Sequence, residues 1–229
     1  MDQAQVSRFP LRALAFDAYG TLFDVHSVIR RCELLWPGQG QAISQLWRTK
    51  QLEYTWQRSL MGRYINFERI TEDGLRYACA ALKLPCETQH IAALMEEYLR
   101  LSTFPDALAT LASLGGIKLA ILSNGTATML HSLVRQAGLA DAFSSILSVD
   151  GLGIYKPDPR VYQLVVDALD MPPANIGFVS SNCWDACGAK AFGFRTFWIN
   201  RGEAPVDLLG AVPDHIVQNL GDLPSLLKQ

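Results

Sequence analysis

The sequence lacks the features that mark membrane, secreted or nucleic-acid-binding proteins. None of its hydrophobic runs approaches the roughly 20 residues that a membrane-spanning helix needs, and the N-terminal stretch MDQAQVSRFPLR holds no apolar signal segment. Basic residues form no long patch, since 20 Lys and Arg are balanced by 22 Asp and Glu for a net charge of -2. We therefore expect a cytoplasmic protein without a membrane or nucleic-acid partner.

Cysteine and histidine are also scarce. The five cysteines are odd in number and include no CxxC pair, which favours free thiols in a reducing compartment. Cys183 and Cys187 stand one helical turn apart, but no histidine or second cysteine pair joins them, whereas structural zinc usually has four N/S ligands. The four histidines fall in no motif. The sequence therefore predicts neither a metal site nor histidine catalysis.

Hydrophobic residues, at 49% of 229, suffice for one substantial core, with or without a smaller inserted domain. A short apolar run at 14–16 predicts a first strand. From 26 to 102 the apolar residues recur at three and four spacing, which predicts helices. From 104 onward strands and helices alternate, which is typical of a parallel sheet covered by helices. The later strands are expected at 117–123, 144–149, 176–181, 194–199 and 215–218, with helices at 126–138, 158–170 and 184–193 between the first four of them.

The fold class predicted is α/β, with a Rossmann-like parallel sheet core and an inserted α-helical cap domain. The first strand has its natural neighbours far along the chain, and an insertion after it is the simplest solution. The core is expected to comprise residues 1–24 and 103–229, and the cap residues 25–102.

Polar residues follow several of the predicted strands. Asp17 comes directly after the first strand, Ser123 and Asn124 stand at the carboxyl end of the second, and Asp185 follows the strand at 176–181. Lys156 stands in the loop before a helix. Each has an ordinary alternative: turn or cap residues, a helix N-terminal acid, a solvated lysine. A parallel sheet would bring these ends together at one edge, however, and a cluster of buried polar groups rarely arises as filler. We interpret Asp17 as a nucleophile that Lys156 orients.

These residues resemble the signature of the haloacid dehalogenase superfamily. The DxxxT[LV] turn is present at Asp17–Leu22, and Ser123, Lys156 and a final acidic segment follow it. More narrowly the chain resembles the L-2-haloacid dehalogenases. That likeness covers nearly the whole chain and is carried by DAYGTLFD, WRTKQLEYTWQRSLMGRY, LSNG, KPDPRVY and VSSNCWDACGAKAFGF.

Tyr19 decides between two chemistries of this superfamily. Its phosphatases resemble one another in a second acid two residues after the nucleophile and a pair of acids in the last motif, which serve a magnesium ion. Here Tyr19 replaces the second acid, and the last motif offers Asp185 as its one acid. A tyrosine supplies no carboxylate at neutral pH. We therefore expect Asp17 to attack carbon rather than phosphorus, without metal or other cofactor.

The resemblance implies an (S)-2-haloacid dehalogenase that converts L-2-haloalkanoates to D-2-hydroxyalkanoates and halide, through an ester on Asp17 and inversion at C2. It assigns a catalytic role to Asp17, Thr21, Lys156, Ser180, Asn182 and Asp185: Thr21, Ser180 and Lys156 orient Asp17, while Asp185, helped by Asn182, activates water. The expected substrate-binding residues are Tyr19, Arg48, Leu52, Phe67, Ser123, Asn124, Tyr162 and Trp184. Arg48, Asn124 and Trp184 are expected at the halide.

Several of these residues have ordinary structural alternatives. Helical Arg48 is otherwise a surface residue, while Tyr162, Tyr19, Leu52, Phe67 and Trp184 also suit core packing. Two other functions stay open: a magnesium-dependent phosphatase of the same superfamily, and a non-catalytic binding module. The halogen, the chain length of the acid and the natural substrate are not specified by the sequence. The resemblance further implies a homodimer.

Overall fold

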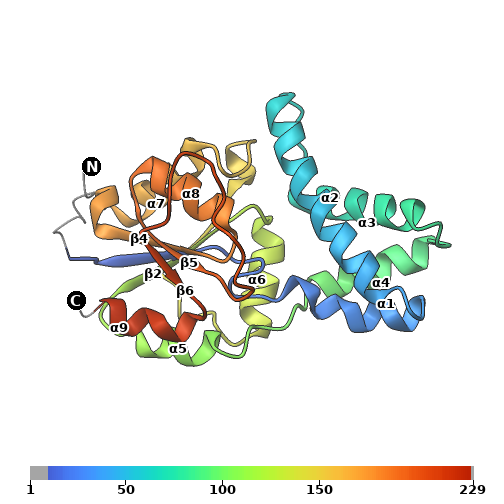
Figure 1. Cartoon of the computed structure of the whole chain (residues 1–229), viewed down its shortest axis with the longest axis horizontal. Coiled ribbons are helices and arrows are strands. Elements are labelled where there is room, and N and C mark those ends of the chain that lie inside the picture. The colour runs from blue at the N-terminus through green and yellow to red at the C-terminus, as the bar shows by residue number, and fades with distance from the viewer. Residues whose placement is uncertain (1–9, 228–229) are drawn as a thin grey trace.

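The computed structural model describes residues 10–227. Residues 1–9 and 228–229, which the expected core includes at its ends, lie outside the described residues. A parallel six-stranded sheet forms one part of the molecule, and a group of helices beside it forms the other (Figure 1). Among the described residues no helix is both long and apolar enough to cross a membrane.

The sheet has the strand order β3-β2-β1-β4-β5-β6, so β1 lies at its centre. All five neighbouring pairs are parallel. Every residue of β1 is buried, as expected for a strand that is covered on both faces. The strands are β1 (Ala13–Phe16), β2 (Lys118–Ser123), β3 (Ser145–Ser148), β4 (Ile176–Ser180), β5 (Arg195–Ile199) and β6 (His215–Val217).

Helices cover both faces of this sheet. In Figure 1, α7 (Pro159–Leu169) and α8 (Cys183–Phe192) lie over one face, whereas α5 (Ala107–Ser113) and α9 (Leu223–Leu227) lie over the other. The segment between β2 and β3 holds α6 (Ala127–Gln136), which begins where the Thr126 side chain accepts from the Met129 N–H. The predicted α/β class with a Rossmann-like core is confirmed.

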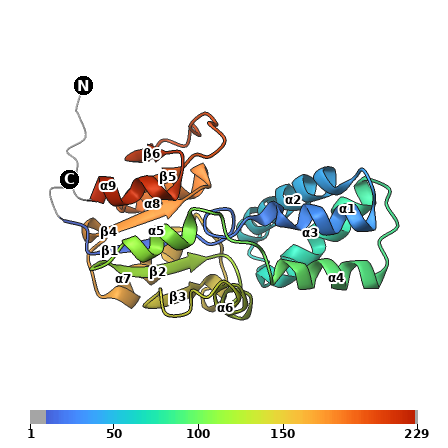
Figure 2. The ribbon, with the colours of Figure 1, turned by 90° about the horizontal axis from the view of Figure 1, so that it is seen from below.

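The remaining helices lie between β1 and α5 in the sequence and beside the sheet in space (Figures 1 and 2). They are α1 (Ile29–Leu35), α2 (Gly40–Leu60), α3 (Phe67–Ala81) and α4 (Thr88–Tyr98). The longest of them, α2, packs along α3, and Gly74 of α3 permits this approach because a Cβ there would lie 3.3 Å from the Gln51 nitrogen. We propose that residues 25–102 constitute the cap domain that the sequence predicts.

Two extended segments connect this helical part to the sheet. Residues 22–24 lead out and residues 102–104 lead back, and they pair through a bridge between Phe23 and Thr103. The Asp24 N–H donates to the Ser102 carbonyl at 2.8 Å, and the Phe104 N–H to the Leu22 carbonyl at 3.0 Å. The outgoing segment therefore begins directly behind the turn that carries Asp17.

Short 3-10 segments join several of these elements. They span Val25–Val28, Val149–Gly151, Pro173–Asn175 and Leu220–Asp222.

Candidate active site

The carboxyl ends of β1, β2 and β4 face the helical part, and the predicted polar cluster assembles there. The chain leaves β1 in a tight turn in which the Thr21, Leu22 and Phe23 N–H groups all point at the Ala18 carbonyl, at 3.0 to 3.3 Å. Gly20 takes a φ of 88°, a left-handed conformation that favours glycine. This turn fixes the direction of the Asp17 side chain, and Asp17 is only 6% exposed.

Three donors hold the Asp17 carboxylate. Lys156 Nζ donates to Oδ1 at 3.0 Å, while Thr21 Oγ1 and Asn182 Nδ2 donate to Oδ2 at 3.0 and 2.9 Å. Thr21 comes from the turn itself, Lys156 from the loop before α7 and Asn182 from the cap of α8. A carboxylate held at both oxygens is fixed in direction, which suits a nucleophile.

Lys156 bridges two buried carboxylates. Its Nζ lies 3.0 Å from Asp17 Oδ1 and 2.9 Å from Asp185 Oδ2, and Lys156 and Asp185 are 1% and 0% exposed. Burial by itself lowers the pKa of Lys156, but Asp17 and Asp185 outweigh it and raise that pKa. Burial raises the pKa of Asp185 to about 6, and the second carboxylate at Asp17 adds to the rise, because one ammonium serves two acids.

Tyr162 binds Asp185. Its hydroxyl donates to Asp185 Oδ1 at 2.9 Å, and burial followed by the Asp185 charge raises the tyrosine pKa well above 10. The resemblance implies a substrate-binding role for Tyr162; the structure places it behind Asp185, where it holds the carboxylate that we expect to activate water.

Two serines and an asparagine support the loops instead of pointing at Asp17. Ser180 Oγ accepts the Asn182 N–H at 3.1 Å. Ser180 therefore orients Asn182, whereas the sequence predicted that Ser180 would orient Asp17 directly. Ser123 Oγ accepts the Gly125 N–H at 3.1 Å, and Asn124 Oδ1 accepts the Lys156 N–H at 3.0 Å. Asn124 thus positions the Lys156 backbone.

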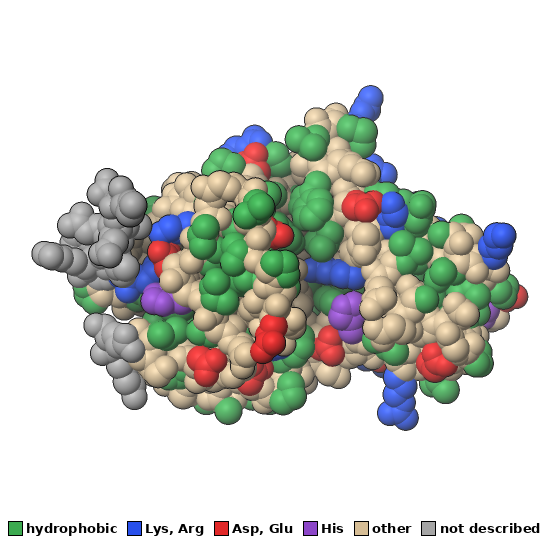
Figure 3. Space-filling model, in the orientation of Figure 1, with side chains coloured by type: hydrophobic (Ala, Val, Ile, Leu, Met, Phe, Trp, Pro, Cys, Tyr) green, Lys and Arg blue, Asp and Glu red, His purple; other side chains and the backbone are tan. Residues whose placement is uncertain are grey.

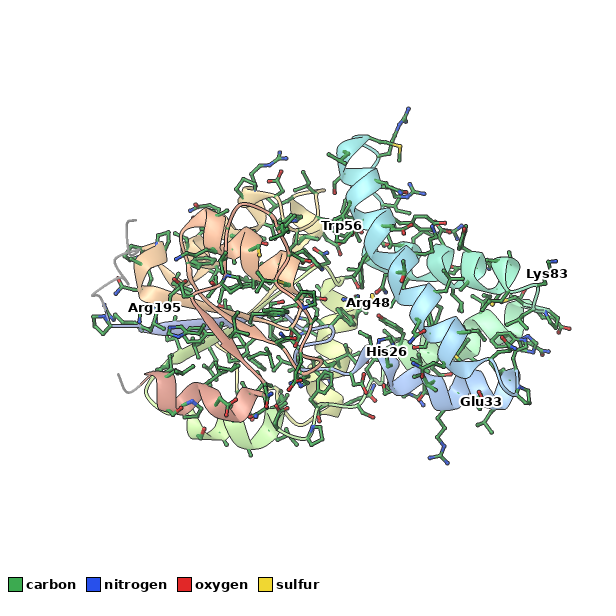
Figure 4. The ribbon with its side chains drawn as sticks, in the orientation of Figure 1. His26, Glu33, Arg48, Trp56, Lys83 and Arg195 are labelled. Carbon is green, nitrogen blue, oxygen red and sulfur yellow. The ribbon has the colours of Figure 1, made fainter. Side chains whose placement is uncertain are left out.

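Arg48 reaches the site from the helical part. Figure 4 shows Arg48 and Trp56 extending from α2 toward the sheet, and Figure 3 shows basic side-chain atoms in the hollow between the two parts. The Arg48 guanidinium donates to Gln51 Oε1 at 2.6 Å and, at 3.4 Å, to both the Tyr19 carbonyl and Asn182 Oδ1. These contacts exclude the alternative that Arg48 is a solvated surface residue, because both 3.4 Å hydrogen bonds reach residues of the sheet part.

The ring of Tyr19, two residues after Asp17, packs against other aromatic rings. The Tyr19 ring lies 5.3 Å from that of Phe67 and 5.6 Å from that of Tyr98, to which it is stacked. The Tyr19 hydroxyl is buried and has no hydrogen-bond partner among the described residues, and burial raises its pKa well above 10. This hydroxyl is therefore neutral, and it lies near Gly125, where an added Cβ would be 3.1 Å from it. Leu52 and Trp184 are partly buried, and the Trp184 ring meets Trp56 edge to face at 5.3 Å.

Sequence reasoning missed Gln51, Tyr98 and Trp56. Gln51 Oε1 accepts from both Arg48 and the Tyr98 hydroxyl, and Gln51 Nε2 donates to Thr71 Oγ1 at 2.8 Å. Gln51 and Trp56 fall inside the WRTKQLEYTW stretch, one and two turns beyond Arg48, so the helical spacing from Arg48 was the available signal. Tyr98 lies in no motif, and its packing on Tyr19 and its hydrogen bond to Gln51 bring it to the site.

The acids of this site do not fit a magnesium ion. Magnesium needs near-octahedral oxygen coordination at about 2.1 Å. Between Asp17 and Asp185 the Lys156 ammonium already contacts one oxygen of each, and donors also occupy Asp17 Oδ2 and Asp185 Oδ1. Within residues 10–227 no three His, Cys, Asp or Glu side chains gather as a metal-holding group.

This fold and site define a haloacid dehalogenase-like hydrolase, and the family model of that description matches residues 11–193. Similar proteins include an (S)-2-haloacid dehalogenase of Pseudomonas sp. strain YL, 51% identical over 92% of this chain and 91% of that one. An L-2-haloacid dehalogenase crystal structure has a TM-score of 0.94 and 47% identity over 96% of this chain and all of that one. The Xanthobacter autotrophicus L-2-haloacid dehalogenase with chloropropionic acid covalently bound has a TM-score of 0.90 and 42% identity over 95% and 98% of the two chains.

The chain belongs to the (S)-2-haloacid dehalogenase family of haloacid dehalogenase-like hydrolases. This confirms the resemblance seen in its motifs.

Proposed function

We propose that this protein hydrolyses the carbon–halogen bond of L-2-haloalkanoates, giving D-2-hydroxyalkanoates and halide. The observation that carries the proposal is the Asp17 carboxylate, held at both oxygens by Lys156, Thr21 and Asn182 in a site whose second acid position is Tyr19. Family membership supports it, because the relatives are (S)-2-haloacid dehalogenases and one was crystallised with chloropropionic acid covalently bound.

In the first step Asp17 attacks C2 from the side opposite the halogen. A bond forms between a carboxylate oxygen and C2, the carbon–halogen bond breaks, and the halogen leaves as halide with the bonding electrons. The product is an ester on Asp17, and C2 is inverted. Arg48 is the cationic group that we assign to the halide, with Asn124 and Trp184 beside it. The unpartnered Tyr19 hydroxyl is a further donor within this pocket.

In the second step water attacks the ester carbonyl carbon of Asp17. Asp185 accepts a proton from this water, so it must be ionised, and Tyr162 and Lys156 hold it in place. The tetrahedral intermediate then collapses, and the leaving alkoxide oxygen takes the proton that remains on the added hydroxyl. The D-2-hydroxyalkanoate is released, the Asp17 carboxylate is restored, and the proton on Asp185 passes to solvent. Because this step leaves C2 untouched, the inversion of the first step is retained. We assign the substrate carboxylate to Ser123 and its neighbouring backbone N–H groups, with Lys156 supplying charge, and the alkyl group to Tyr19, Leu52, Phe67 and Trp184.

The experiment that tests the proposal is halide release from the separate L and D enantiomers of 2-chloropropionate, with EDTA present. Release from the L form alone, abolished in D17N, is the expected result. It would establish the enantiomer, the nucleophile and the independence from metal together. Silence on both enantiomers, with magnesium-dependent phosphate release from a generic phosphate ester, would contradict the proposal and favour the phosphatase.

We further propose a cytoplasmic homodimer. Leu60 and Met61, at the end of α2, are 89% and 63% exposed, and the association of two chains would remove such apolar side chains from water. Light scattering after gel filtration tests this: a mass of one chain, in place of two, would exclude the dimer.

A further inference from the structure

Arg201 contacts the backbone of the turn that carries the nucleophile. It follows β5 by two residues, and its side chain is 24% exposed. Nη1 lies 3.5 Å from the Gly20 carbonyl, and Nη2 lies 3.3 Å from the Thr21 carbonyl. The preceding carbonyl of the turn, that of Tyr19, accepts from Arg48 and Asn182. Three consecutive carbonyls that follow Asp17 in the chain thus each face a side-chain donor from a distant segment.

The same guanidinium also reaches the loop after β4. Nη1 donates to Ser181 Oγ at 2.8 Å, and the Ser181 N–H donates to Thr21 Oγ1 at 2.8 Å. Thr21 Oγ1 in turn donates to Asp17 Oδ2 at 3.0 Å. A continuous series of contacts therefore runs from Arg201 through Ser181 and Thr21 to the nucleophile. Arg201 makes no hydrogen bond to Asp17 itself, so its action on the reaction is indirect.

On its other side Arg201 holds the segment that returns from the helical part. Its Cζ lies 3.8 Å from the centre of the Phe104 ring, and Nη2 pairs with both Asp106 oxygens, at 3.2 and 3.3 Å. Asp106 Oδ2 also accepts the Leu220 N–H at 2.7 Å, which anchors the pair to the sheet part. Arg201 thereby ties the nucleophile turn to the paired segments 22–24 and 102–104 that carry α1–α4.

We propose that Arg201 is a positioning residue, which aligns the Asp17 turn with the segments that bear the helical part and its Arg48. This inference rests on the proposed function, because it assigns the residue a part in the same reaction. Arginine suits this position because its planar fork of five N–H donors reaches carbonyls, a hydroxyl and a carboxylate at once and stacks on a ring. A lysine ammonium has three donors and no plane to stack.

The test compares R201Q and R201K with wild type and with the control R76Q. Arg76 is also ion-paired to an acid, Glu72 at 2.6 Å, but on the exposed face of α3. Displacement of a nucleophile by about 1 Å costs about 100-fold in rate, so R201Q should lose about 10- to 100-fold in kcat for L-2-chloropropionate while KM changes less than about threefold. R201K should recover part of this loss, and R76Q should match wild type.

A second readout does not depend on catalysis. Hydrogen exchange of the Thr21, Leu22 and Phe23 amides, which all donate to the Ala18 carbonyl, should be at least about tenfold faster in R201Q than in wild type or R76Q. D106N keeps the arginine but removes its ion pair, so it should accelerate exchange of the same amides less than R201Q does. If R201Q fails to fold, D106N and R201K take its place in both measurements.

Unchanged exchange at these amides, or a raised KM with kcat unchanged in folded R201Q, would overturn the assignment. A wild-type enzyme that releases no halide would refute the proposed function by itself. In that case the exchange data still decide the Arg201 inference: faster exchange at the turn supports it, and unchanged exchange rejects it.

Discussion

At the scale of single residues, the site depends on one ammonium shared by two buried carboxylates. Lys156 lies within 3.0 Å of an oxygen of both Asp17 and Asp185, so two acids compete for one positive charge. One of the two acids therefore ionises less readily, and the structure assigns that cost to Asp185, the more deeply buried. The two carboxylates thus differ in environment, which matches the two roles proposed for them: a fixed nucleophile and an acid that gains and loses a proton.

The raised pKa of Asp185 predicts the pH dependence of turnover. Water activation needs the ionised carboxylate. Burial raises the pKa of Asp185 to about 6 beside the Asp17 carboxylate, but the ester on Asp17 carries no charge, so the Asp185 pKa that governs this step lies lower. Steady-state turnover should therefore fall about tenfold per pH unit at a pH below about 6. Halide release in a single turnover comes before water attack and should keep its rate to lower pH. Stopped-flow halide release and steady-state kcat, measured from about pH 4.5 to about pH 8, make the comparison. Identical profiles for the two quantities would remove Asp185 from the water step.

Removal of the shared ammonium predicts a large loss of stability. K156M leaves two buried carboxylates unpaired, a type of change that costs about 3–5 kcal/mol of unfolding free energy. The pKa of Asp185 should rise further above its ordinary 3.8, so the folded variant binds more protons than the unfolded chain, and its stability should fall as pH rises from about 5 to about 8. Urea unfolding at both pH values measures this. K50M, at a lysine paired with Glu53 on the surface, is the control, and an equal midpoint for the two variants would contradict the prediction.

At the scale of elements, the sequence predicts the long and periodic segments well. The helices around Trp47, Leu75 and Val165 are present because their apolar residues repeat at helical spacing, and the strands around Phe16 and Phe178 because short buried runs end in turn residues. The helices α5 and α9 were not predicted, since seven and five residues are too few to show a period.

The residues of the site also divide into those that a local sequence pattern predicts and those that it does not. Residues at strand ends, such as Asp17 and Asp185, could be placed together because parallel strands end at one edge. Tyr98 and Arg201 could not, because they act on partners far along the chain: Tyr98 donates to a side chain 47 residues away, and Arg201 contacts a carbonyl 181 residues away. Such contacts follow from the packing of elements, and no local pattern of residues encodes them.

Packing of α3 against α2 predicts an effect on catalysis from a distance. A Cβ at Gly74 would lie 3.3 Å from both the Gln51 nitrogen and Trp47 Cδ1, so the branched side chain of G74V should push α2 away. Overpacking of this kind costs about 1–3 kcal/mol, and displacement of Arg48 and Gln51 should lower kcat/KM by about tenfold or more. The control is G115A, where an added Cβ meets nothing within 4 Å. Thermal unfolding and steady-state kinetics test both variants; normal kcat/KM in a destabilised G74V would show that α2 keeps its place.

At the scale of the whole molecule, the site lies between two parts that are joined by two short segments. The sheet part supplies Asp17, Lys156 and Asp185, and the helical part supplies Arg48 through α2 (Figure 4). The direct hydrogen bonds from Arg48 to the sheet part are both long, at 3.4 Å, so the arginine is held only weakly on that side. A bound haloacid, with its carboxylate and halogen both seeking positive donors, would add contacts to both parts at once.

This arrangement predicts that substrate stabilises the molecule, and that Arg48 is needed for much of the effect. D17N should bind L-2-chloropropionate without forming the ester, so its thermal unfolding is measurable with ligand present. At a ligand concentration about 100 times Kd the gain is about 2.7 kcal/mol, which raises Tm by roughly 5–11 °C for a chain of this size. In D17N/R48A at the same concentration the shift should shrink to less than about half, because the helical part loses its charge on the ligand.

The D enantiomer controls for anion binding in this experiment. When the carboxylate of the D enantiomer is bound as that of the L enantiomer is, the halogen points away from Arg48. The D enantiomer should therefore raise the Tm of D17N less than the L enantiomer does. Equal shifts in D17N and D17N/R48A would mean that the helical part closes over the ligand without Arg48, and that the halide is held by the sheet part alone.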